Sequence, residues 1–446
     1  MKDPAALRVD RTLRHPLLLL GVLVVGGVVA AGVVWLLVSL PFVQDLLADQ
    51  FAFSIIVMAV MLGVILGATA YCILAERKLS AFIQDRHGPN RVGFAGFFQP
   101  MADGLKFVLK EDIIPRNIDR PLFIIAPAIS FTISLVGFAI IPWAGEVQWP
   151  WMAAGETVSV QVASIDIGFL YLIAIASMGV YGVVLGSYAS NNKYSFYGGM
   201  RAAAQMISYE IPLGLGLVCI LLTAGSLRLE EVVDMQARSG LWFVAYQPLA
   251  FLLILISAFA ETNRLPFDLA EAEQELVGGF HTEYSALKFG LFFLGEYAHM
   301  VTNSALMIAL FFGGWHLWLL PGADAVSWPA MLVKFGVFWV KIAAFIWFYM
   351  LVRWSLPRFR FDQLMRLAWQ GLVPIGIGLV LATCLLVALD LHRNVFASLG
   401  ANAVVLVVAL LWAARSKAPV TGRQANLPEI RVLPERAKAG GGSAGR

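Results

Sequence analysis

The stretch FSIIVMAVMLGVILGATAYCILA, residues 53–75, contains no charged side chain. A helix needs about 20 consecutive apolar residues to cross a membrane, so this stretch is long enough for one span. Directly after it comes ERKLSAFIQDRHGPNRVG, residues 76–93, in which charged residues are frequent. Long apolar runs that alternate with charged loops are typical of a polytopic membrane protein, and they predict an all-α transmembrane helical bundle.

The same alternation holds over the whole chain of 446 residues, of which 59% are hydrophobic and only 14% are charged. Soluble domains carry about 25% charged residues, so the composition excludes an ordinary soluble protein. Ten apolar runs have spanning length, and the fifth is interrupted by polar, proline and glycine residues. The predicted spans are 17–40, 53–75, 121–142, 166–188, 205–225, 244–262, 287–313, 330–353, 371–389 and 396–414.

Basic residues are distributed unevenly over the predicted loops. If the N-terminus is cytoplasmic, the inside segments hold 27 Lys and Arg, and the outside loops hold only Arg228, Arg238 and Arg393. The positive-inside rule assigns the basic loops to the cytoplasm, so both termini are expected there. The first run, 17–40, is longer than the apolar part of a signal peptide, which has about 7–15 residues, and is predicted to be a retained span.

The first long cytoplasmic loop, 76–120, predicts two short amphipathic helices in the membrane interface. Apolar residues recur at helical spacing in 79–83 and again in 101–108, and charged residues lie off that face. The alternative is a charged loop that faces phospholipid. That alternative explains the basic residues but not the acids mixed among them.

Several ionisable residues fall within the predicted spans: Glu210, Glu296, Lys334 and Lys341, of which Lys341 lies deepest. A charge at mid-span costs about 2.5–3.5 kcal/mol on insertion scales, and such residues mark either ion pathways or structural charge pairs. For Glu210, the second interpretation is a hydrogen bond to a neighbouring helix near the interface. His299 lies on the same helix face as Glu296, and a packing role is expected for it.

A second cytoplasmic segment, 260–284, gathers six acids around one base, Arg264. The acids are Glu261, Asp268, Glu271, Glu273, Glu275 and Glu283. Asp268 and Glu271 have the spacing of a capping box, which predicts that a short helix begins there. Clustered carboxylates suit proton storage and relay, and an acidic docking surface for a partner explains them equally well.

The three cysteines, Cys72, Cys219 and Cys384, lie far apart within apolar runs, and the sequence contains no C-x-x-C motif. An iron–sulfur cluster needs about four thiolates, so this chain is expected to hold none by itself. All three cysteines are predicted to be small buried apolar residues. The sequence also lacks a phosphate-binding glycine-rich loop and a spaced Cys/His metal set.

The cytoplasmic motifs resemble one family. The segments 76–93, 191–210 (NNKYSFYGGMRAAAQMISYE) and 260–285 (AETNRLPFDLAEAEQELVGGFHTEYS) follow in the order seen in the quinone-site membrane subunits, or H subunits, of NADH:quinone oxidoreductase, respiratory complex I. The similarity extends over about 53–390. It implies a core of eight helices in the bacterial cytoplasmic membrane, a quinone access tunnel and an acidic funnel that couples quinone reduction to proton pumping.

The resemblance also implies roles for particular residues. The predicted proton path comprises Glu210, Glu261, Glu271, Glu273, Glu275 and Glu296, and Lys341 is added to it as a buried charge. The predicted quinone chamber comprises Arg77, Asp103 and Arg264. Quinone is the expected substrate, whereas NADH, FMN and iron–sulfur clusters are expected on partner subunits, and no cofactor is expected on this chain. Redox-arm subunits would dock on loops 76–120 and 263–288, beside neighbouring small membrane subunits.

The resemblance divides the chain into three parts. Residues 1–52 form an N-terminal extension with an extra span, 53–390 form the family core, and 391–446 hold an extra C-terminal span and a basic tail that is expected to be disordered. Two alternatives remain open. One is the equivalent subunit of a membrane-bound hydrogenase or related dehydrogenase, and the other is a stand-alone ion/proton antiporter.

Overall fold

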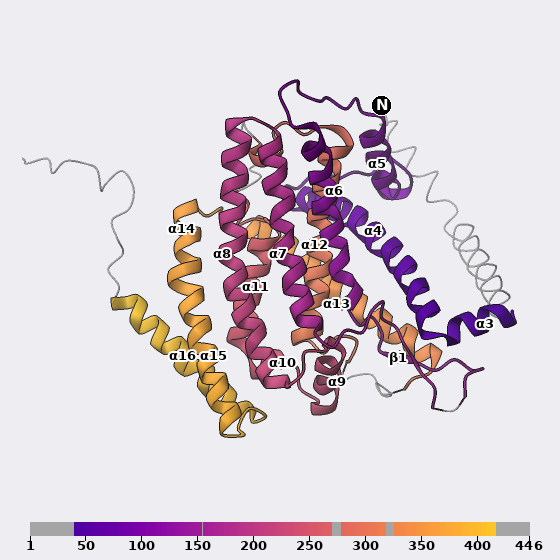
Figure 1. The fold of residues 1–446 in the computed structure, drawn as a ribbon, viewed down its shortest axis with the longest axis vertical. Helices are drawn as coiled ribbons and strands as arrows, with labels where there is room; N and C mark the ends of the chain where they lie inside the picture. The colour runs from indigo at the N-terminus through magenta and orange to yellow at the C-terminus, as the bar shows by residue number, and fades with distance from the viewer. Residues whose placement is uncertain (1–39, 154, 270–277, 318–324, 416–446) are drawn as a thin grey trace, which may run out of the picture.

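A computed structural model describes residues 40–153, 155–269, 278–317 and 325–415 (Figure 1). Seven helices in this part of the chain are long and apolar enough to cross a membrane. The all-α, polytopic architecture is therefore confirmed, whereas the number of ten spans stays a prediction. The predicted span 17–40, apart from its last residue, and the basic tail beyond 415 lie outside the described residues.

The regular structure is almost entirely helical, with one small antiparallel pair of strands. The helices are α3 (Pro41–Ala48), α4 (Gln50–Ile83), α5 (Gln99–Leu109), α6 (Arg120–Val136), α7 (Gly168–Ala189), α8 (Lys193–Ala224), α9 (Leu229–Ser239), α10 (Phe243–Tyr246), α11 (Pro248–Glu261), α12 (Ala286–Phe311), α13 (Trp328–Ser355), α14 (Phe361–Arg366), α15 (Val373–Ala388) and α16 (Val395–Arg415). A π-helical segment, Leu367–Leu372, joins α14 to α15, so that these three form one span. The strands are β1 (Glu146–Val147) and β2 (Val158–Ser159).

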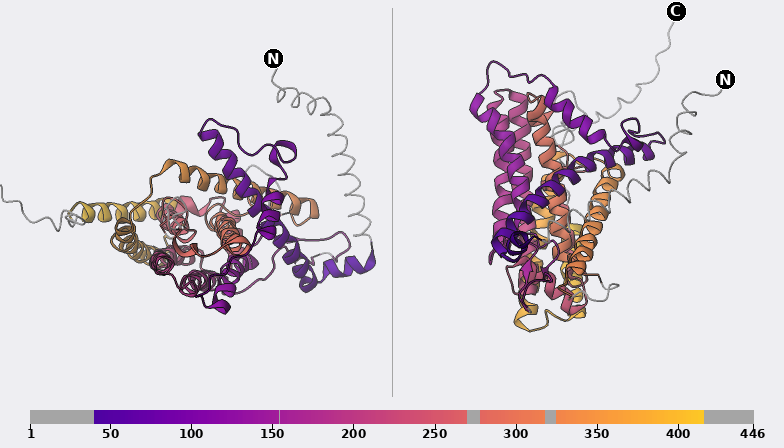
Figure 2. Two further views of the ribbon diagram at one scale, coloured as in Figure 1. Left: turned by 90° about the horizontal axis from the view of Figure 1, so that it is seen from above. Right: turned by 90° about the vertical axis from the view of Figure 1, so that its right-hand side faces the viewer.

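The arrangement is an upright group of helices with oblique helices on one side. Helix α6 packs on α7 and α12, and α8 packs on α7, α11 and α15. Figures 1 and 2 show α4 and α13 crossing this group at an angle. Helix α5 lies at one end of the molecule, and α9 and α10 lie at the opposite end (Figure 1).

Each predicted span within the described residues overlaps a helix, but the ends differ. Helix α8 begins at Lys193 rather than at 205 and continues through Pro212. Its early turns support the loop after α11: Ser195 Oγ donates to the carbonyl of Phe280 at 2.7 Å. Gly198 allows this close approach, because an added Cβ would lie 2.7 Å from the Gly279 carbonyl carbon. The helix is therefore longer than a span needs.

The loop 76–120 contains one of the two predicted interfacial helices. Helix α5, Gln99–Leu109, matches the second of them. The first prediction is wrong, because 79–83 are the last residues of α4 and not a separate helix. The run of residues from 50 to 83 contains no proline, and the helix continues past its apolar part to Ile83.

The additional C-terminal helix α16 is joined to the bundle by a buried amide. The Asn402 Nδ2 group donates to Gln247 Oε1 at 3.2 Å, and its Oδ1 accepts from the Leu249 N–H at 3.3 Å. Asn402 is 5% exposed. Because a buried amide without partners is costly, these bonds fix α16 against the start of α11.

The cysteine prediction holds for two residues of three. Cys72 and Cys219 are buried, but Cys384 is exposed. Cys384 lies on a face of α15 that α8 and α16 leave uncovered in the described part of the chain. Cys384 therefore belongs to an apolar run of the sequence but is not buried in the described structure.

Candidate functional site

The ends of α4 and α11 meet the middle of α12 and the end of α13 at a group of paired charges. Arg264 Nη1 lies 3.2 Å from Glu76 Oε2, and Arg264 Nε lies 2.5 Å from Glu296 Oε1. Arg353 forms a further ion pair with Glu76. We call these four residues the arginine cluster. Two acids balance two bases in it, as buried charges require.

The orientation of Arg264 is fixed by an aromatic side chain. The guanidinium carbon lies 4.0 Å from the ring centroid of Tyr297, which is a favourable cation–π position. The Tyr297 hydroxyl in turn donates to Glu76 Oε2 at 2.7 Å. The side chains of Arg264 and Glu76 are 7% and 9% exposed, so water screens their interaction only slightly.

Glu261, the last residue of α11, has different partners. Its Oε1 lies 3.3 Å from His299 Nε2, and its Oε2 accepts from Asn303 Nδ2 at 3.2 Å. His299 is therefore a partly buried histidine with a carboxylate partner, and its role beyond packing stays a prediction. His299 follows Glu296 by one helical turn of α12, and Glu261 contacts it from the end of α11.

Glu210 lies on α8 and faces α7, where Ser177 Oγ donates to its Oε1. The predicted hydrogen bond to a neighbouring helix is thus present. The described residues form no ion pair with Glu210, so its carboxyl group has a neutral partner, in contrast to the carboxylates of the arginine cluster.

Two small cavities lie along these acids. A cavity of about 60 Å³ is lined by Glu261, Glu296 and His299 among others, and one of about 10 Å³ is lined by Glu210 and Glu261. A water molecule needs about 10–15 Å³ on this measure, so the first has room for several waters and the second for about one. Glu261 lines both cavities. We call Glu296, Glu261 and Glu210 the carboxylate line.

The residues predicted for the quinone chamber separate into two places. Arg77 Nη1 and Asp103 Oδ2 form an ion pair of 2.6 Å between α4 and α5, and their side chains are 47% and 23% exposed. Arg264 belongs to the buried arginine cluster instead. The adjacent residues Glu76 and Arg77 point to different sides of α4, one into the bundle and one towards α5.

Lys341 does not join the carboxylate line. Its ammonium group donates to the carbonyls of Phe312, Gly314 and His316 at 2.7, 2.8 and 2.6 Å. These three bonds use all three donors of a lysine and hold the segment after α12. The role of Lys341 in a proton path stays a prediction, and its contacts favour the alternative, a structural charge.

The acidic segment 260–284 is described only in part. Glu271, Glu273 and Glu275, and the helix predicted to begin near Asp268, fall in 270–277, outside the described residues. Asp268 Oδ2 pairs with Arg358 Nη2 at 3.1 Å, and Glu283 Oε1 accepts from Asn192 at 2.6 Å. Both acids therefore hold the ends of this segment on the bundle.

Aromatic rings surround the end of this segment. His281 packs edge-on against Phe280 and Phe289, and burial lowers the pKa of its imidazole. Tyr284 stacks on Phe123 at 4.1 Å between centroids, and burial raises the pKa of its phenol. The described end of the loop thus favours the neutral forms of both groups.

Sequence reasoning missed two members of the arginine cluster. Glu76 follows an apolar run and precedes Arg77, so it reads as an interfacial charge. Arg353 reads only as a basic residue at a loop boundary. The sequence did contain a signal for Glu76. Positive charges flank most spans on the cytoplasmic side, so an acid directly after a span is unusual. Among the described residues, no group of three or more His, Cys, Asp or Glu could hold a metal ion.

Comparisons with known proteins agree on one family. A family profile described as NADH dehydrogenase matches residues 55–384. A protein of Leptospira biflexa, named as the H subunit of NADH-quinone oxidoreductase, is 48% identical over 324 residues, which cover 71% of this chain and 90% of the relative. A protein of Flavobacterium psychrophilum, also named as an H subunit of this enzyme, is 45% identical over 75% of this chain and 96% of its own length. One of Geobacter sulfurreducens with the same name is 46% identical over 73% of this chain and 93% of its own length.

Proposed function

Because the chain belongs to the NADH dehydrogenase family that includes the H subunits of NADH-quinone oxidoreductase, we propose that it couples quinone reduction to proton translocation in respiratory complex I. It is a multi-pass membrane subunit of an oxidoreductase complex in the bacterial inner membrane. Its partners are other subunits of that complex. In the proposal it provides the quinone access tunnel and an acidic funnel.

The carboxylate line is the observation on which the proposal rests. Glu296 belongs to the arginine cluster, Glu261 shares a cavity with Glu296 and His299, and Glu210 shares the next cavity with Glu261. Ionisable residues within a bundle mark ion pathways when they face a wet or protein-lined interior. The two cavities that Glu261 lines, the larger with room for several waters, support a path for protons.

Reduction of a quinone to a quinol takes up two electrons and two protons. In the proposal, electrons arrive from iron–sulfur clusters of partner subunits, which also hold NADH and FMN, and this chain binds no cofactor. The quinone head lies near Arg77, Asp103 and Arg264. A change of charge there is transmitted through the arginine cluster, and protons move between His299, Glu261 and Glu210.

The cytoplasmic end is the proposed docking surface for the redox arm, through loops 76–120 and 263–288. Helix α5 supports this, because its apolar residues Met101 and Val108 are 70% and 65% exposed in this chain alone. With this end in the cytoplasm, both termini are cytoplasmic. The division into an extension (1–52), a family core (53–390) and a C-terminal addition (391–446) is part of the same proposal.

Replacement of Glu210 or Glu296 by Ala tests the proposal in the intact complex. We expect quinone-linked turnover and proton pumping to fall at least about tenfold, a loss of about 1.4 kcal/mol of transition-state stabilisation. NADH oxidation by an artificial acceptor should persist, because the redox subunits are unchanged. The matched control is Glu156→Ala, an exposed acid in the loop between α6 and α7. Normal coupled activity in both variants would refute the assigned role.

A further inference from the structure

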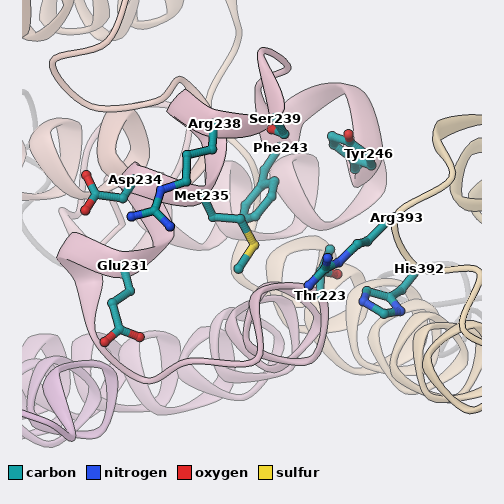
Figure 3. Close-up of a pocket in the computed structure, with 10 residues that line it drawn as sticks. All are labelled: Thr223, Glu231, Asp234, Met235, Arg238, Ser239, Phe243, Tyr246, His392 and Arg393. Atoms are coloured by element: carbon teal, nitrogen blue, oxygen red, sulfur yellow. The ribbon is translucent and has the colours of Figure 1, made fainter. Parts of the chain in front are cut away.

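The outer end of the molecule holds a polar depression in which the outer-loop arginines gather. Arg238 and Arg393 line a cavity of about 650 Å³ between α8, α9, α10 and the turn that joins α15 to α16 (Figure 3). Arg228 and Arg238 line a neighbouring cavity of about 510 Å³. The predicted orientation places only these three Lys or Arg residues in the outer loops. Their position around two neighbouring cavities therefore needs an explanation.

The larger cavity contains two exposed arginines. Arg228, in the neighbouring cavity, pairs with Asp166 at 2.8 Å and with Glu231 at 3.7 Å, whereas the guanidinium groups of Arg238 and Arg393 form no ion pair or hydrogen bond with any described residue. A guanidinium has five donors in a fork that matches phosphate geometry. Two such groups in one cavity are suited to an oxygen-rich anion.

The acids of the cavity lie opposite Arg393. Figure 3 shows Glu231 and Asp234 at one side of the cavity, with the Arg238 guanidinium next to Asp234, and Arg393 and His392 at the other side. A simple anion would meet repulsion from the two carboxylates. A ligand with a phosphate and an ammonium group separated by a short linker would satisfy both sides.

Apolar surface lies directly beside this charged cavity. Leu389, Leu391 and Phe396, in and around the turn between α15 and α16, are 58%, 42% and 85% exposed. Both helices are long enough to cross the membrane. A ligand that is held here by a charged head would find an apolar surface for hydrocarbon chains next to it.

We propose that this cavity binds the headgroup of a zwitterionic, amine-bearing phospholipid of the outer leaflet. The phosphate binds Arg238 and Arg393, the ammonium binds Glu231 and Asp234, and the acyl chains follow α15 and α16. The volume of about 650 Å³ falls within the range of about 300–1,000 Å³ that ligand sites occupy. Helices α9 and α10 form one wall of the cavity, and the turn before α16 forms the other. A lipid bound between these walls therefore joins the added helix α16 to the core.

A photoreactive phosphatidylethanolamine, added to the purified intact complex after delipidation, tests this proposal. Cross-linked peptides are identified by mass spectrometry in the unmodified complex and in Arg393→Gln, Glu231→Gln and the control Arg415→Gln, which lies at the far end of α16. We expect labelling of 229–246 and 389–396, and about tenfold weaker labelling in the first two variants, since a lost charged contact of about 1.4 kcal/mol changes affinity tenfold. Arg415→Gln should label normally.

Competition identifies the chemistry that the cavity recognises. Unlabelled phosphatidylethanolamine should displace the probe, whereas phosphatidylglycerol and inorganic phosphate should displace it weakly. Equal displacement by phosphatidylglycerol would overturn the zwitterionic assignment, and strong displacement by phosphate would overturn a lipid site. Unchanged labelling in both cavity variants would overturn the proposal as a whole. Amounts of assembled complex and NADH oxidation by an artificial acceptor show whether the variants fold.

Discussion

The glutamate carboxylates of the arginine cluster and those of the rest of the carboxylate line have different kinds of partners. In the cluster, Glu76 and Glu296 are paired with Arg264, and Arg353 also pairs with Glu76. Further along, Glu261 meets a histidine and an amide, and Glu210 meets a hydroxyl. Arginine stays protonated at every accessible pH, whereas histidine exchanges protons near neutrality.

This difference separates structural charge from mobile charge. Arginine partners hold carboxylates as fixed anions and fix the geometry of four helices. Partners that are neutral or titratable leave a carboxyl group able to accept and release a proton. We therefore expect that replacement of either arginine of the cluster damages folding, whereas replacements at Glu261 and Glu210 damage turnover.

The largest effect is expected from Arg264→Met. Removal of one partner from a buried ion-pair group costs about 3–5 kcal/mol, because the remaining charges stay buried without compensation. Glu296 would lose its arginine, and Glu76 would keep Arg353 and the Tyr297 hydroxyl. We expect little assembled complex in the membrane and a strongly lowered inactivation temperature, measured on native gels and by thermal inactivation.

Arg264→Lys is the matched control for charge. It keeps the cation but loses the fork and the stacking on Tyr297, so an intermediate amount of complex is expected. If Arg264→Met assembles as well as the unmodified chain, the arginine cluster is not the structural centre that the comparison requires.

Glu261→Gln is expected to have the second largest effect, and on turnover rather than on assembly. Glutamine has the same shape and retains a carbonyl oxygen for Asn303, but it cannot exchange a proton with His299. Quinone reduction coupled to pumping should fall about a hundredfold, the lower end of the range of about 10²–10⁴-fold that general acid–base groups contribute. The assembled amount should stay near normal. A variant that is poorly assembled yet fully active per molecule would reverse the comparison.

A smaller effect is expected from pH at the cytoplasmic loop. Burial lowers the pKa of His281 below its ordinary value of 6.5, so the folded loop prefers the neutral imidazole. The stability that this provides is present above pH 6.5 and is lost as the pH falls towards the lowered value, because the unfolded loop takes up the proton first. The protection factors of the 278–285 amides, which correct hydrogen exchange for its intrinsic pH dependence, should therefore fall on acidification. In His281→Gln this fall should be absent, and an equal fall would exclude His281 as the cause.

The smallest effect on stability is expected from Arg77→Gln. Its ion pair with Asp103 is largely exposed, and exposed pairs contribute about 0–1 kcal/mol. The inactivation temperature should hardly change, in contrast to Arg264→Met. Any loss should appear in the Michaelis constant for quinone if Arg77 lines the chamber. A large loss of assembled complex would mean that the α4–α5 contact is structural.

The sequence predicted the helices well because apolar run length and charge placement act locally. The predicted helix ends were wrong where tertiary packing determines them. Asn192 caps the start of α8 well before the apolar run, and α4 continues beyond its apolar part. Glu210, Glu261 and Glu296 could be found for the same local reason, since a charge in an apolar run is conspicuous, whereas Glu76, which directly follows a run, was not.

Pairing could not be predicted in the same way. Glu76 lies 188 positions from Arg264 and 277 from Arg353, and no local pattern connects them. The sequence indicates only that Lys341 and Glu261 are charges within apolar runs. In the structure, Lys341 donates to three carbonyls, whereas Glu261 contacts a histidine. Only the crossing of the helices determines which partner each receives.

Redox-triggered infrared difference spectroscopy of the intact complex tests most directly whether the carboxyl group of Glu261 changes protonation when quinone is reduced. We predict a carboxylic acid band that appears on reduction, disappears in Glu261→Gln and persists in the control Glu283→Gln, whose acid only holds Asn192. A band that is unchanged in Glu261→Gln, in a complex that still reduces quinone and pumps protons, would contradict a protonation change at this residue.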